Sequence, residues 1–231
     1  VADNIDFHLD AGARHALIGP NGAGKTTFVN MLTGRITPSS GAIVLGGADI
    51  TGASQRERVK RGLGRTFQIN TLFRNLTVVD NVALSVAERA GVGGGLFGVA
   101  SKQKAIVDES MALLDSLGLA ADARVTVMGL PYGKQRLVEI AIALGLKPKV
   151  LLLDEPAAGV PSRESHRILE VIAALPSDIA VLIIEHDMDL VFRFAKRITV
   201  LAQGAVLMEG TPAEIRTDPR VRQVYLGEDH V

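Results

Sequence analysis

The chain of 231 residues has no cysteine and no tryptophan, and its aromatic residues are seven phenylalanines and two tyrosines. Without cysteine it cannot form a disulfide framework, a thiolate zinc site or a thiol nucleophile. It also has no excess charge of either sign, because 25 Lys and Arg residues balance 25 Asp and Glu residues. A protein that coats nucleic acid needs a surplus of basic side chains, so we expect no nucleic-acid partner.

Long apolar runs are absent as well. The longest is the six-residue segment Ile179–Ile184, whereas a membrane-spanning helix needs about 20 apolar residues. The first four residues, Val-Ala-Asp-Asn, lack the basic flank and apolar stretch of a signal peptide. The sequence therefore predicts a soluble intracellular α/β domain, long enough for one large domain or for a core with a subdomain.

Apolar runs of strand length alternate with helical patterns in two blocks, which predicts a mainly parallel sheet with helices on both faces. The clearest buried strands are Ala16–Ile18, Val150–Leu153 and Ile179–Ile184. They end at residues that can do chemistry, namely Gly19, Asp154-Glu155 and Glu185-His186. Because doubly wound sheets bind ligands beyond the carboxyl ends of their strands, we expect these three ends to share one site.

The segment between the two blocks is typical of helices. Thr77 and Asp80 form a capping signal, and apolar residues recur at helical spacing between Val107 and Leu117, before a stop at Gly118. A glycine-rich connector spans residues 91–98. Near the end of the chain, the segment Thr211–Glu214 combines an N-cap, a proline and a capping-box glutamate, which predicts a further short helix.

The segment Gly19-Pro20-Asn21-Gly22-Ala23-Gly24-Lys25-Thr26 matches the pattern G-x-x-x-x-G-K-[ST] between a predicted strand and a predicted helix. Its glycines let backbone N–H groups converge on phosphate oxygens, and the helix adds the positive end of its dipole. We expect Lys25 to neutralise the terminal phosphates and the Thr26 hydroxyl to hold Mg²⁺. The alternative is a glycine-rich turn with an exposed lysine, which the full pattern in this setting disfavours.

A second acidic motif, Asp154-Glu155, ends an apolar strand. Carboxylates at such a place need a cation or water as partner, since burial without one is costly. Asp154 is the candidate Mg²⁺ acid, acting directly or through water, and Glu155 is the candidate base that orients the attacking water. Taken alone, the pair could equally be solvated at the strand end.

The phosphate loop, Gln68 after Arg65-Thr66-Phe67, the Asp154-Glu155-Pro156 segment, and His186 after Ile183-Ile184-Glu185 occur in this order. In these four motifs the chain resembles ATP-binding-cassette ATPases over nearly its whole length. Further segments resemble the ATP-binding subunits of branched-chain amino acid importers. They are Gly64–Gln68, Leu72–Val78, Asp154–Gly159 and Gly210–Ile215. Similar subunits serve amide or urea uptake, and a lipopolysaccharide-export ATPase is a close relative.

The resemblance implies an α/β fold: a P-loop NTPase (RecA-like) core with a β-rich N-terminal part and an inserted α-helical subdomain. We expect the core at 1–68 and 148–210, the helical subdomain with its signature loop at 69–147, and a short helical tail at 211–231. The implied cofactors are ATP and Mg²⁺. The implied function is ATP hydrolysis that powers an importer for branched-chain amino acids or related amides, through ATP-driven dimerisation.

The resemblance also assigns residues to roles. It implies catalytic roles for Glu155, His186 and Gln68. It implies nucleotide contacts for Asn21, Gly22, Ala23, Gly24, Lys25, Thr26, Thr27, Tyr132, Gly133, Lys134 and Gln135. It implies metal contacts for Thr26, Gln68 and Asp154. Gln68 would relay the nucleotide state to the helical insertion, and His186 would contact the γ-phosphate, the alternative being a buried structural histidine.

The implied partners are a second ATPase subunit, identical or different, and two transmembrane permease subunits, with a solute-binding protein involved indirectly. The expected location is the cytoplasmic face of the inner (plasma) membrane, as a peripheral subunit. In the ATPase pair, each subunit would complete the other's ATP site with its signature loop. ATP binding would close the pair and hydrolysis would reopen it.

Two prolines depart from the family pattern. The usual signature Leu-Ser-Gly-Gly-Gln is here Leu130-Pro131-Tyr132-Gly133-Lys134, followed by Gln135. Pro131 removes a hydroxyl and a backbone N–H that would reach the partner's phosphate. Lys134 could restore positive charge there or could simply be a solvated lysine. Pro161 stands where the family often has an Asn that crosses the interface.

Both prolines lie in segments that act on the opposite nucleotide. Our hypothesis is that the chain pairs with a different ATPase subunit and keeps its own site competent while weakening the partner's. The alternative function is a regulatory or scaffold subunit that binds nucleotide with a weakened composite site.

Two further expectations concern aromatic and basic residues. Cassette ATPases stack adenine on an aromatic side chain before the first strand, but the candidate here, Phe7, looks part of a strand, so we expect the stacking residue upstream of Val1. A basic run from Arg56 to Arg65 favours a solvated helix face over a membrane or acidic-partner contact.

Overall fold

The computed structural model describes residues 2–66, 72–92 and 100–226. Its centre is a six-stranded sheet in the order β4-β5-β6-β1-β7-β8, parallel throughout except for the β7–β8 pair. The strands of this sheet are β1 Arg14–Ile18, β4 Leu63–Arg65, β5 Val150–Asp154, β6 Ala180–Ile184, β7 Arg197–Ala202 and β8 Ala205–Gly210. A separate antiparallel pair consists of β2 Val44–Leu45 and β3 Ala48–Asp49.

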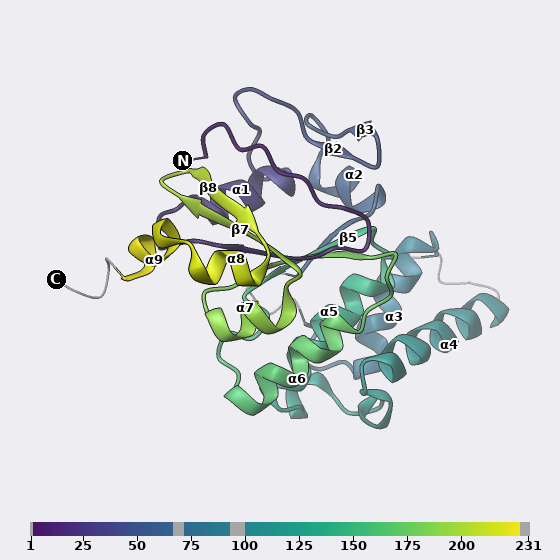
Figure 1. Cartoon of the computed structure of the whole chain (residues 1–231). Helices are drawn as coiled ribbons and strands as arrows, with labels where there is room; N and C mark the ends of the chain where they lie inside the picture. Colours follow the sequence, from purple (N-terminus) through teal and green to yellow (C-terminus); the bar gives the residue numbers. More distant parts are fainter. Residues whose placement is uncertain (1, 67–71, 93–99, 227–231) are drawn as a thin grey trace.

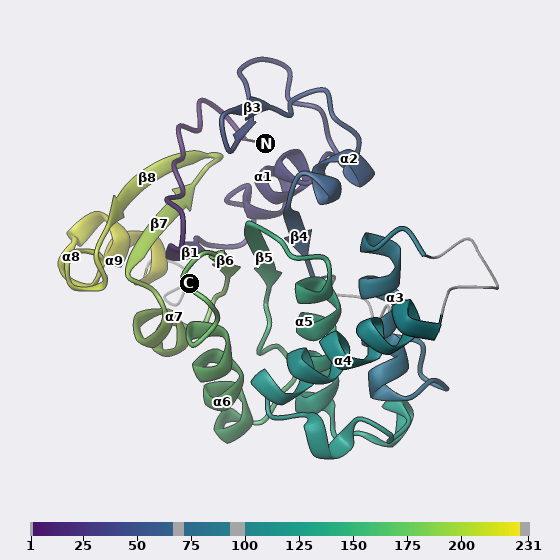
Figure 2. The same cartoon turned by 90° about the vertical axis from the view of Figure 1, so that its right-hand side faces the viewer.

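Helices surround the sheet (Figures 1 and 2). They are α1 Lys25–Leu32, α2 Gln55–Lys60, α3 Val78–Arg89, α4 Ala100–Ser116, α5 Tyr132–Gly145, α6 Ser162–Ala173, α7 Met188–Phe194, α8 Pro212–Thr217 and α9 Pro219–Leu226. Short 3₁₀ turns cover Ala120–Asp122 and Val127–Gly129. Within the described ranges, no helix has the length and apolar character to cross a bilayer.

The strands bury both faces, so their apolar residues run continuously rather than alternating with polar ones. Leu17 of β1 and Leu152 of β5 pack with Phe28 of α1 on one face. Ile18 and Leu151 join the cluster on the other face, which α5, α6 and α7 cover (Figure 1). The three predicted buried strands are confirmed, and β5, β6 and β1 are direct neighbours. Their carboxyl ends therefore meet at one edge of the sheet.

The helices between β4 and β5 share a core with the sheet. Val82 of α3, Leu114 of α4 and Ile140 of α5 are buried in the same hydrophobic cluster as Leu151 of β5. Figure 2 shows α3, α4 and α5 grouped on one side of the molecule. The boundaries that we expected for a helical subdomain stay a prediction, because a continuous core crosses them.

Local signals for helix ends are confirmed where the structure describes them. Thr77 Oγ1 accepts a hydrogen bond from the Asp80 N–H at 3.2 Å and so caps α3. Thr211 and Glu214 form the expected capping box at α8. Gly118 has a φ of 71° just after α4, a conformation that glycine adopts without strain. The expected connector at 91–98 lies mostly outside the described residues.

Phe7 is not in a strand, contrary to our expectation. Ile5, Phe7 and Leu9 lie in a segment without regular secondary structure and pack their side chains on the apolar cluster beside α1. The Phe7 ring meets Phe28 edge to face at 5.3 Å between centroids. Every second side chain of this segment, from Ile5 to Leu9, is therefore partly buried, although its backbone is not hydrogen-bonded into a sheet.

The basic run is not uniformly solvated. Arg56 and Lys60 are exposed, but Arg58 is 2% exposed. Its guanidinium donates hydrogen bonds to the carbonyls of Met31 and Leu32, both at 2.7 Å. These carbonyls lie in the last turn of α1, where the Met31 carbonyl also accepts from the Gly34 N–H at 3.2 Å, so Arg58 adds side-chain donors that stabilise this helix end.

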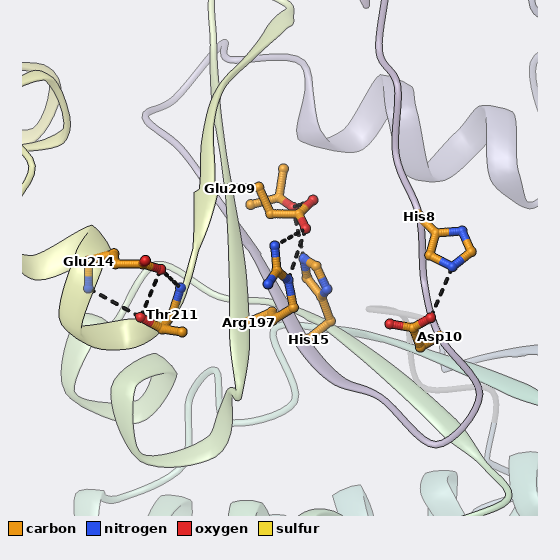
Figure 3. A network of polar contacts seen from close by, with 8 residues as sticks. His8, Asp10, His15, Arg197, Glu209, Thr211 and Glu214 are labelled. Atoms are coloured by element: carbon orange, nitrogen blue, oxygen red, sulfur yellow. Dashed lines mark hydrogen bonds and ion pairs between the residues drawn. The ribbon is translucent and has the colours of Figure 1, made fainter.

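A polar network joins β1, β7 and β8 near the amino ends of the parallel strands (Figure 3). His15 is 2% exposed, and its Nε2 lies 2.8 Å from the Thr199 hydroxyl. Thr199 donates to Glu209 Oε2 at 3.1 Å, and Arg197 donates to Glu209 Oε1 at 2.8 Å. Since the single hydroxyl hydrogen of Thr199 goes to Glu209, the His15 Nε2 carries the hydrogen of its bond.

Candidate functional site

The phosphate loop connects the carboxyl end of β1 to the start of α1. A Cβ at Gly19 would lie 2.3 Å from the Leu201 carbonyl, so only glycine fits this close approach. Gly24, the N-cap of α1, has a φ of 100°, a left-handed conformation that other residues avoid. The Ala23 carbonyl accepts a hydrogen bond from the Gly204 N–H at 3.0 Å, which fixes the loop to the β7–β8 turn.

The predicted nucleotide residues of this loop, Asn21 to Thr27, form one continuous turn into α1. Asn21, Gly22 and Thr26 are exposed, whereas Ala23 and Gly24 are buried. The Lys25 ammonium donates to the carbonyls of Gly19 at 2.5 Å and Pro20 at 3.0 Å, so its charge is held over the loop. Backbone N–H groups, a helix N-terminus and an ammonium group together favour an anion.

Asp154 ends β5, and its side chain is 13% exposed. Its Oδ2 accepts a hydrogen bond at 3.0 Å from Arg65 at the end of the adjacent strand β4. Arg65 also donates to Asn30 Oδ1 at 3.2 Å and so links Asp154 to α1. This ion pair compensates the burial of the carboxylate and positions it beside the helix that carries Thr26.

Glu155 follows Asp154 and has a φ of 46°. A non-glycine residue in this left-handed region costs on the order of 1–2 kcal/mol, and such strain concentrates at functional sites. Its Oε1 lies 3.5 Å from His186 Nδ1, just after the neighbouring strand β6. The His186 side chain is 68% exposed, so the alternative of a buried structural histidine is wrong. Gln68 lies outside the described residues.

Glu185 was among the strand-end residues that the sequence singled out, without a specific role, and it directly precedes His186. It is 2% exposed, and one carboxylate oxygen accepts a hydrogen bond at 3.3 Å from the Ala157 N–H. Burial raises the pKa of the Glu185 carboxyl, while the backbone N–H of Ala157 and the charge of His186 oppose that rise. The sequence signal for its burial was its position directly after the six-residue apolar run Ile179–Ile184.

The predicted signature residues begin α5, and within the described residues no hydrogen bond or ion pair joins them to the phosphate loop. Tyr132 is exposed, and the Arg136 guanidinium lies 5.0 Å from its ring centroid. Lys134 forms an ion pair with Asp122 at 2.7 Å. Gln135 is buried and donates to the Leu130 carbonyl at 2.9 Å. Nucleotide contacts of these side chains stay predictions.

The glycine at position 133 lies where the start of α5 packs against α6. A Cβ at this position would lie 2.4 Å from a carboxylate oxygen of Glu164 on α6. The N-terminus of α5 thus packs closely against the Glu164 side chain, whose flexible end would have to move to admit a larger residue at position 133.

The two prolines that depart from the family pattern have the same local role. Pro131 is the N-cap of α5 and Pro161 is the N-cap of α6, each without a side-chain cap. The Pro131 carbonyl accepts from the Gln135 N–H at 3.1 Å, and the Pro161 carbonyl accepts from the Ser165 N–H at 3.0 Å. Both prolines therefore start helices, with a fixed φ in place of the usual polar cap.

The donor set fits Mg²⁺ bound together with a nucleotide. Among the residues that the structure describes, no three His, Cys, Asp or Glu side chains gather into a metal cage. Mg²⁺ typically binds through one or two carboxylates, water and substrate phosphates, using oxygen ligands alone. The Asp154 carboxylate, at the end of β5, and the exposed Thr26 hydroxyl, in the first turn of α1, carry oxygens of this kind.

The chain is similar to known proteins over most of its length. Residues 2–158 match the family model described as ABC transporter. Residues 205–231 match a second model, described as branched-chain amino acid ATP-binding cassette transporter. The first match covers the phosphate loop, both strand-end acids and the signature segment.

Two curated relatives illustrate the similarity. The chain is 39% identical over 233 residues to the high-affinity branched-chain amino acid transport ATP-binding protein LivG of Escherichia coli K12, covering 98% of this chain and 91% of that protein. It is 39% identical over 220 residues to the corresponding protein BraF of Pseudomonas aeruginosa, covering 92% and 86%.

Solved structures show the same fold. A crystal structure of the ADP conformation of an ATP-binding cassette of an ABC transporter superimposes with a TM-score of 0.84 at 29% identity, covering 98% of this chain and 92% of that chain. A dimeric cassette in a post-hydrolysis state, bound to ADP and phosphate, superimposes with a TM-score of 0.72 at 25% identity, covering 91% and 90%.

Proposed function

This chain belongs to the ABC transporter family, as an ATP-binding subunit of the branched-chain amino acid group, and on that basis we propose how its site powers import. It hydrolyses ATP, and the free energy drives transport of a branched-chain amino acid or a related amide. The single observation that carries the proposal is the meeting of the phosphate loop, Asp154, Glu155 and His186 at one edge of the sheet.

The phosphate loop before α1 binds ATP. Backbone N–H groups of residues 21–27 surround the phosphates, and Lys25 exchanges its two carbonyl partners for phosphate oxygens. Thr26 and Asp154 would hold Mg²⁺, with Gln68 as a further contact. When bound, the metal neutralises charge on the terminal phosphates. Arg65 keeps the Asp154 carboxylate oriented through its bond to Oδ2.

Hydrolysis needs a base for the attacking water. Glu155 takes this role, since its carboxyl sits at the strand end beside His186. His186 orients Glu155 through Nδ1 and offers its exposed ring to the γ-phosphate. A positioned acid–base group of this kind contributes roughly 10²–10⁴ in rate.

ABC cassettes dimerise and pair with permease subunits. For this chain we propose a second ATPase subunit and two transmembrane permease subunits as partners, with the cassette at the cytoplasmic face of the membrane. Tyr132, Gly133, Lys134 and Gln135 then face the partner's nucleotide, and Lys134 leaves Asp122 to do so. Pro131 and Pro161 favour a heterodimer in which this chain's own ATP site is the competent one. Equal ATP turnover at both sites of the purified pair would contradict that asymmetry.

The test of the ATPase role is Glu155→Gln in the transporter assembled with its native membrane subunits. We expect single-turnover ATP cleavage to fall by roughly 10²–10⁴, or about 3–5 kcal/mol of barrier. Glu170→Gln, an exposed acid on α6, is the matched control and keeps the wild-type rate. The same complex, assayed with leucine, isoleucine, valine and amides in turn, identifies the solute by which one stimulates turnover.

A scaffold role is the second candidate, because Pro131 and Pro161, which begin α5 and α6, provide no side-chain donor for a composite ATP site. It predicts that the wild type and Glu155→Gln are equally slow in the assembled transporter, although both bind ATP.

A further inference from the structure

Glu185 is a buried carboxyl that the proposed reaction does not use. It lies directly after β6, between Ile184, which pairs with Asp154 of β5, and the candidate His186. Glu185 is only 2% exposed, so its carboxylate has lost its hydration and needs hydrogen-bond donors from the protein instead. Among the residues that the structure describes, those donors are backbone N–H groups, chiefly that of Ala157, rather than a lysine or arginine side chain.

The segment that Glu185 contacts begins with Glu155 itself. Three hydrogen bonds hold this turn. The Glu155 N–H donates to the Ile184 carbonyl at 2.9 Å, and the Ala158 N–H donates to the Glu155 carbonyl at 3.0 Å. The third is the bond from the Ala157 N–H to the Glu185 carboxylate at 3.3 Å. Of the three, only this one depends on a side chain.

The turn needs such a clamp because Glu155 is in the left-handed region, with a φ of 46°. A strained residue of this type keeps its conformation only when its surroundings hold it. If the turn relaxed, the Glu155 carboxyl would move away from His186 Nδ1, which now lies 3.5 Å from it. Catalytic groups lose much of their effect when displaced by about 1 Å.

We propose that Glu185 is a positioning residue for ATP hydrolysis: by accepting the Ala157 N–H it fixes the turn that aims Glu155 at the attacking water. The inference rests on the proposed function, since it needs Glu155 as the base. It assigns Glu185 no contact with the nucleotide.

The same geometry explains why an acid follows the strand. The Glu185 backbone is part of the chain that carries His186, while its side chain reaches the chain that carries Glu155. One residue therefore ties the two candidate groups to each other across β5 and β6. An apolar residue would pack equally well but would leave the Ala157 N–H without its acceptor.

The experiment compares Glu185→Gln with Glu185→Leu in the transporter assembled with its membrane subunits, by single-turnover ATP cleavage and by ATP affinity. Gln keeps an oxygen at the same reach, so the rate stays within about threefold of wild type. Leu removes the acceptor, so the rate falls roughly 10- to 100-fold while ATP affinity changes less than about threefold. A Leu variant at the wild-type rate, or a Gln variant as slow as Leu, overturns the proposal.

A double variant separates positioning from general damage. If Glu185 acts through Glu155, adding Glu185→Leu to Glu155→Gln slows cleavage by less than about twofold, because the aimed group is already gone. A full multiplicative loss overturns the inference. Glu155→Gln alone at the wild-type rate instead refutes the proposed function, so the two failures are distinct.

Thr199→Val is the control for loss of a buried hydrogen bond elsewhere in the sheet, and it should leave the rate unchanged. If Glu185→Leu does not fold, Glu185→Asp replaces it. Asp keeps the charge but pulls the oxygen back, so the inference requires Asp to be slower than Gln. Asp as fast as or faster than Gln overturns it.

Discussion

The two ends of the central sheet carry polar clusters of opposite character. At the amino ends, His15, Thr199 and Glu209 are bonded to one another in a chain that ends on Arg197 (Figure 3). At the carboxyl ends, Glu155 and His186 lie 3.5 Å apart, and His186 is mostly exposed. The side chains of the first cluster bond to one another inside the sheet, whereas the second cluster presents the exposed His186 ring to solvent.

The difference also appears in the backbone. Glu155 at the carboxyl end is held in a left-handed conformation, while His15 and Thr199 sit in regular strands. Backbone strain at the carboxyl ends is typical of a functional site, whereas unstrained, hydrogen-bonded strand residues at the amino ends are typical of a structural network. Burial alone would not have separated them, because Glu185 and His15 are equally buried, at 2%.

The two histidines of this comparison should respond in opposite ways to removal. His186→Ala should lower ATP turnover by about 10²-fold, because it removes the group beside the base. The unfolding free energy should change by less than about 0.5 kcal/mol, since the side chain is 68% exposed. Single-turnover assays and denaturant melts measure the two quantities. A large loss of stability would place His186 among the structural residues.

Lys25→Met should weaken ATP binding roughly 10- to 100-fold, since a hydrogen bond to a charged group is worth about 1.5–3 kcal/mol. Its matched control is Lys196→Met, an exposed lysine at the start of β7 at the other end of the sheet. Titration with a fluorescent ATP analogue measures both. Equal effects of the two substitutions would mean that general charge, rather than the loop, attracts the nucleotide.

His15→Leu should lower the unfolding free energy by about 1–3 kcal/mol, because it leaves the Thr199 hydroxyl inside the protein with one partner fewer. ATP turnover of the folded protein should stay at the wild-type rate. Urea unfolding and a turnover assay at saturating ATP test both halves. A drop in ATP turnover without a loss of stability would show that the amino-end cluster contributes to catalysis, and would contradict the purely structural role assigned to His15.

The carboxyl-end side of this contrast could be predicted from the sequence, and the amino-end cluster could not. The runs Ala16–Ile18, Val150–Leu153 and Ile179–Ile184 predicted strands whose ends meet, and all three are strands in adjacent positions. They could be predicted because parallel strands buried on both faces leave unbroken apolar runs, with a change of character where the strand ends. The capping box at Thr211 and Glu214 was equally readable, since it depends on neighbours in sequence.

Contacts between residues that are far apart in the chain could not be predicted from the sequence. Arg65 and Asp154 are 89 residues apart, and only the β4–β5 neighbourhood brings them within 3.0 Å. Arg58 was expected on a solvated face because helical spacing says nothing about the carbonyls of α1 nearby. Glu185 and His15 lie beside or within apolar strands, but their partners come from other strands and turns. Sequence periodicity reports burial, not partners.

The smallest expected effect is the pH dependence that His15 gives to stability. Burial is the main cause that lowers the pKa of His15 below its usual 6.5, with Arg197 acting in the same direction and Glu209 and Asp10 against it. The unfolded chain therefore binds more protons than the folded protein between that lowered pKa and 6.5, so stability falls as pH drops through this window. One group can contribute a slope of at most about 1.4 kcal/mol per pH unit. The unfolding free energy of the wild type minus that of His15→Leu, measured from pH 7.5 to 5 by urea titration, isolates this term from the other titrating groups. We expect this difference in unfolding free energy to shrink as the pH falls. A difference that stays constant or grows would mean that the folded protein accommodates a protonated His15 beside Glu209, so that the amino-end cluster can form an ion pair and is not a purely neutral structural network.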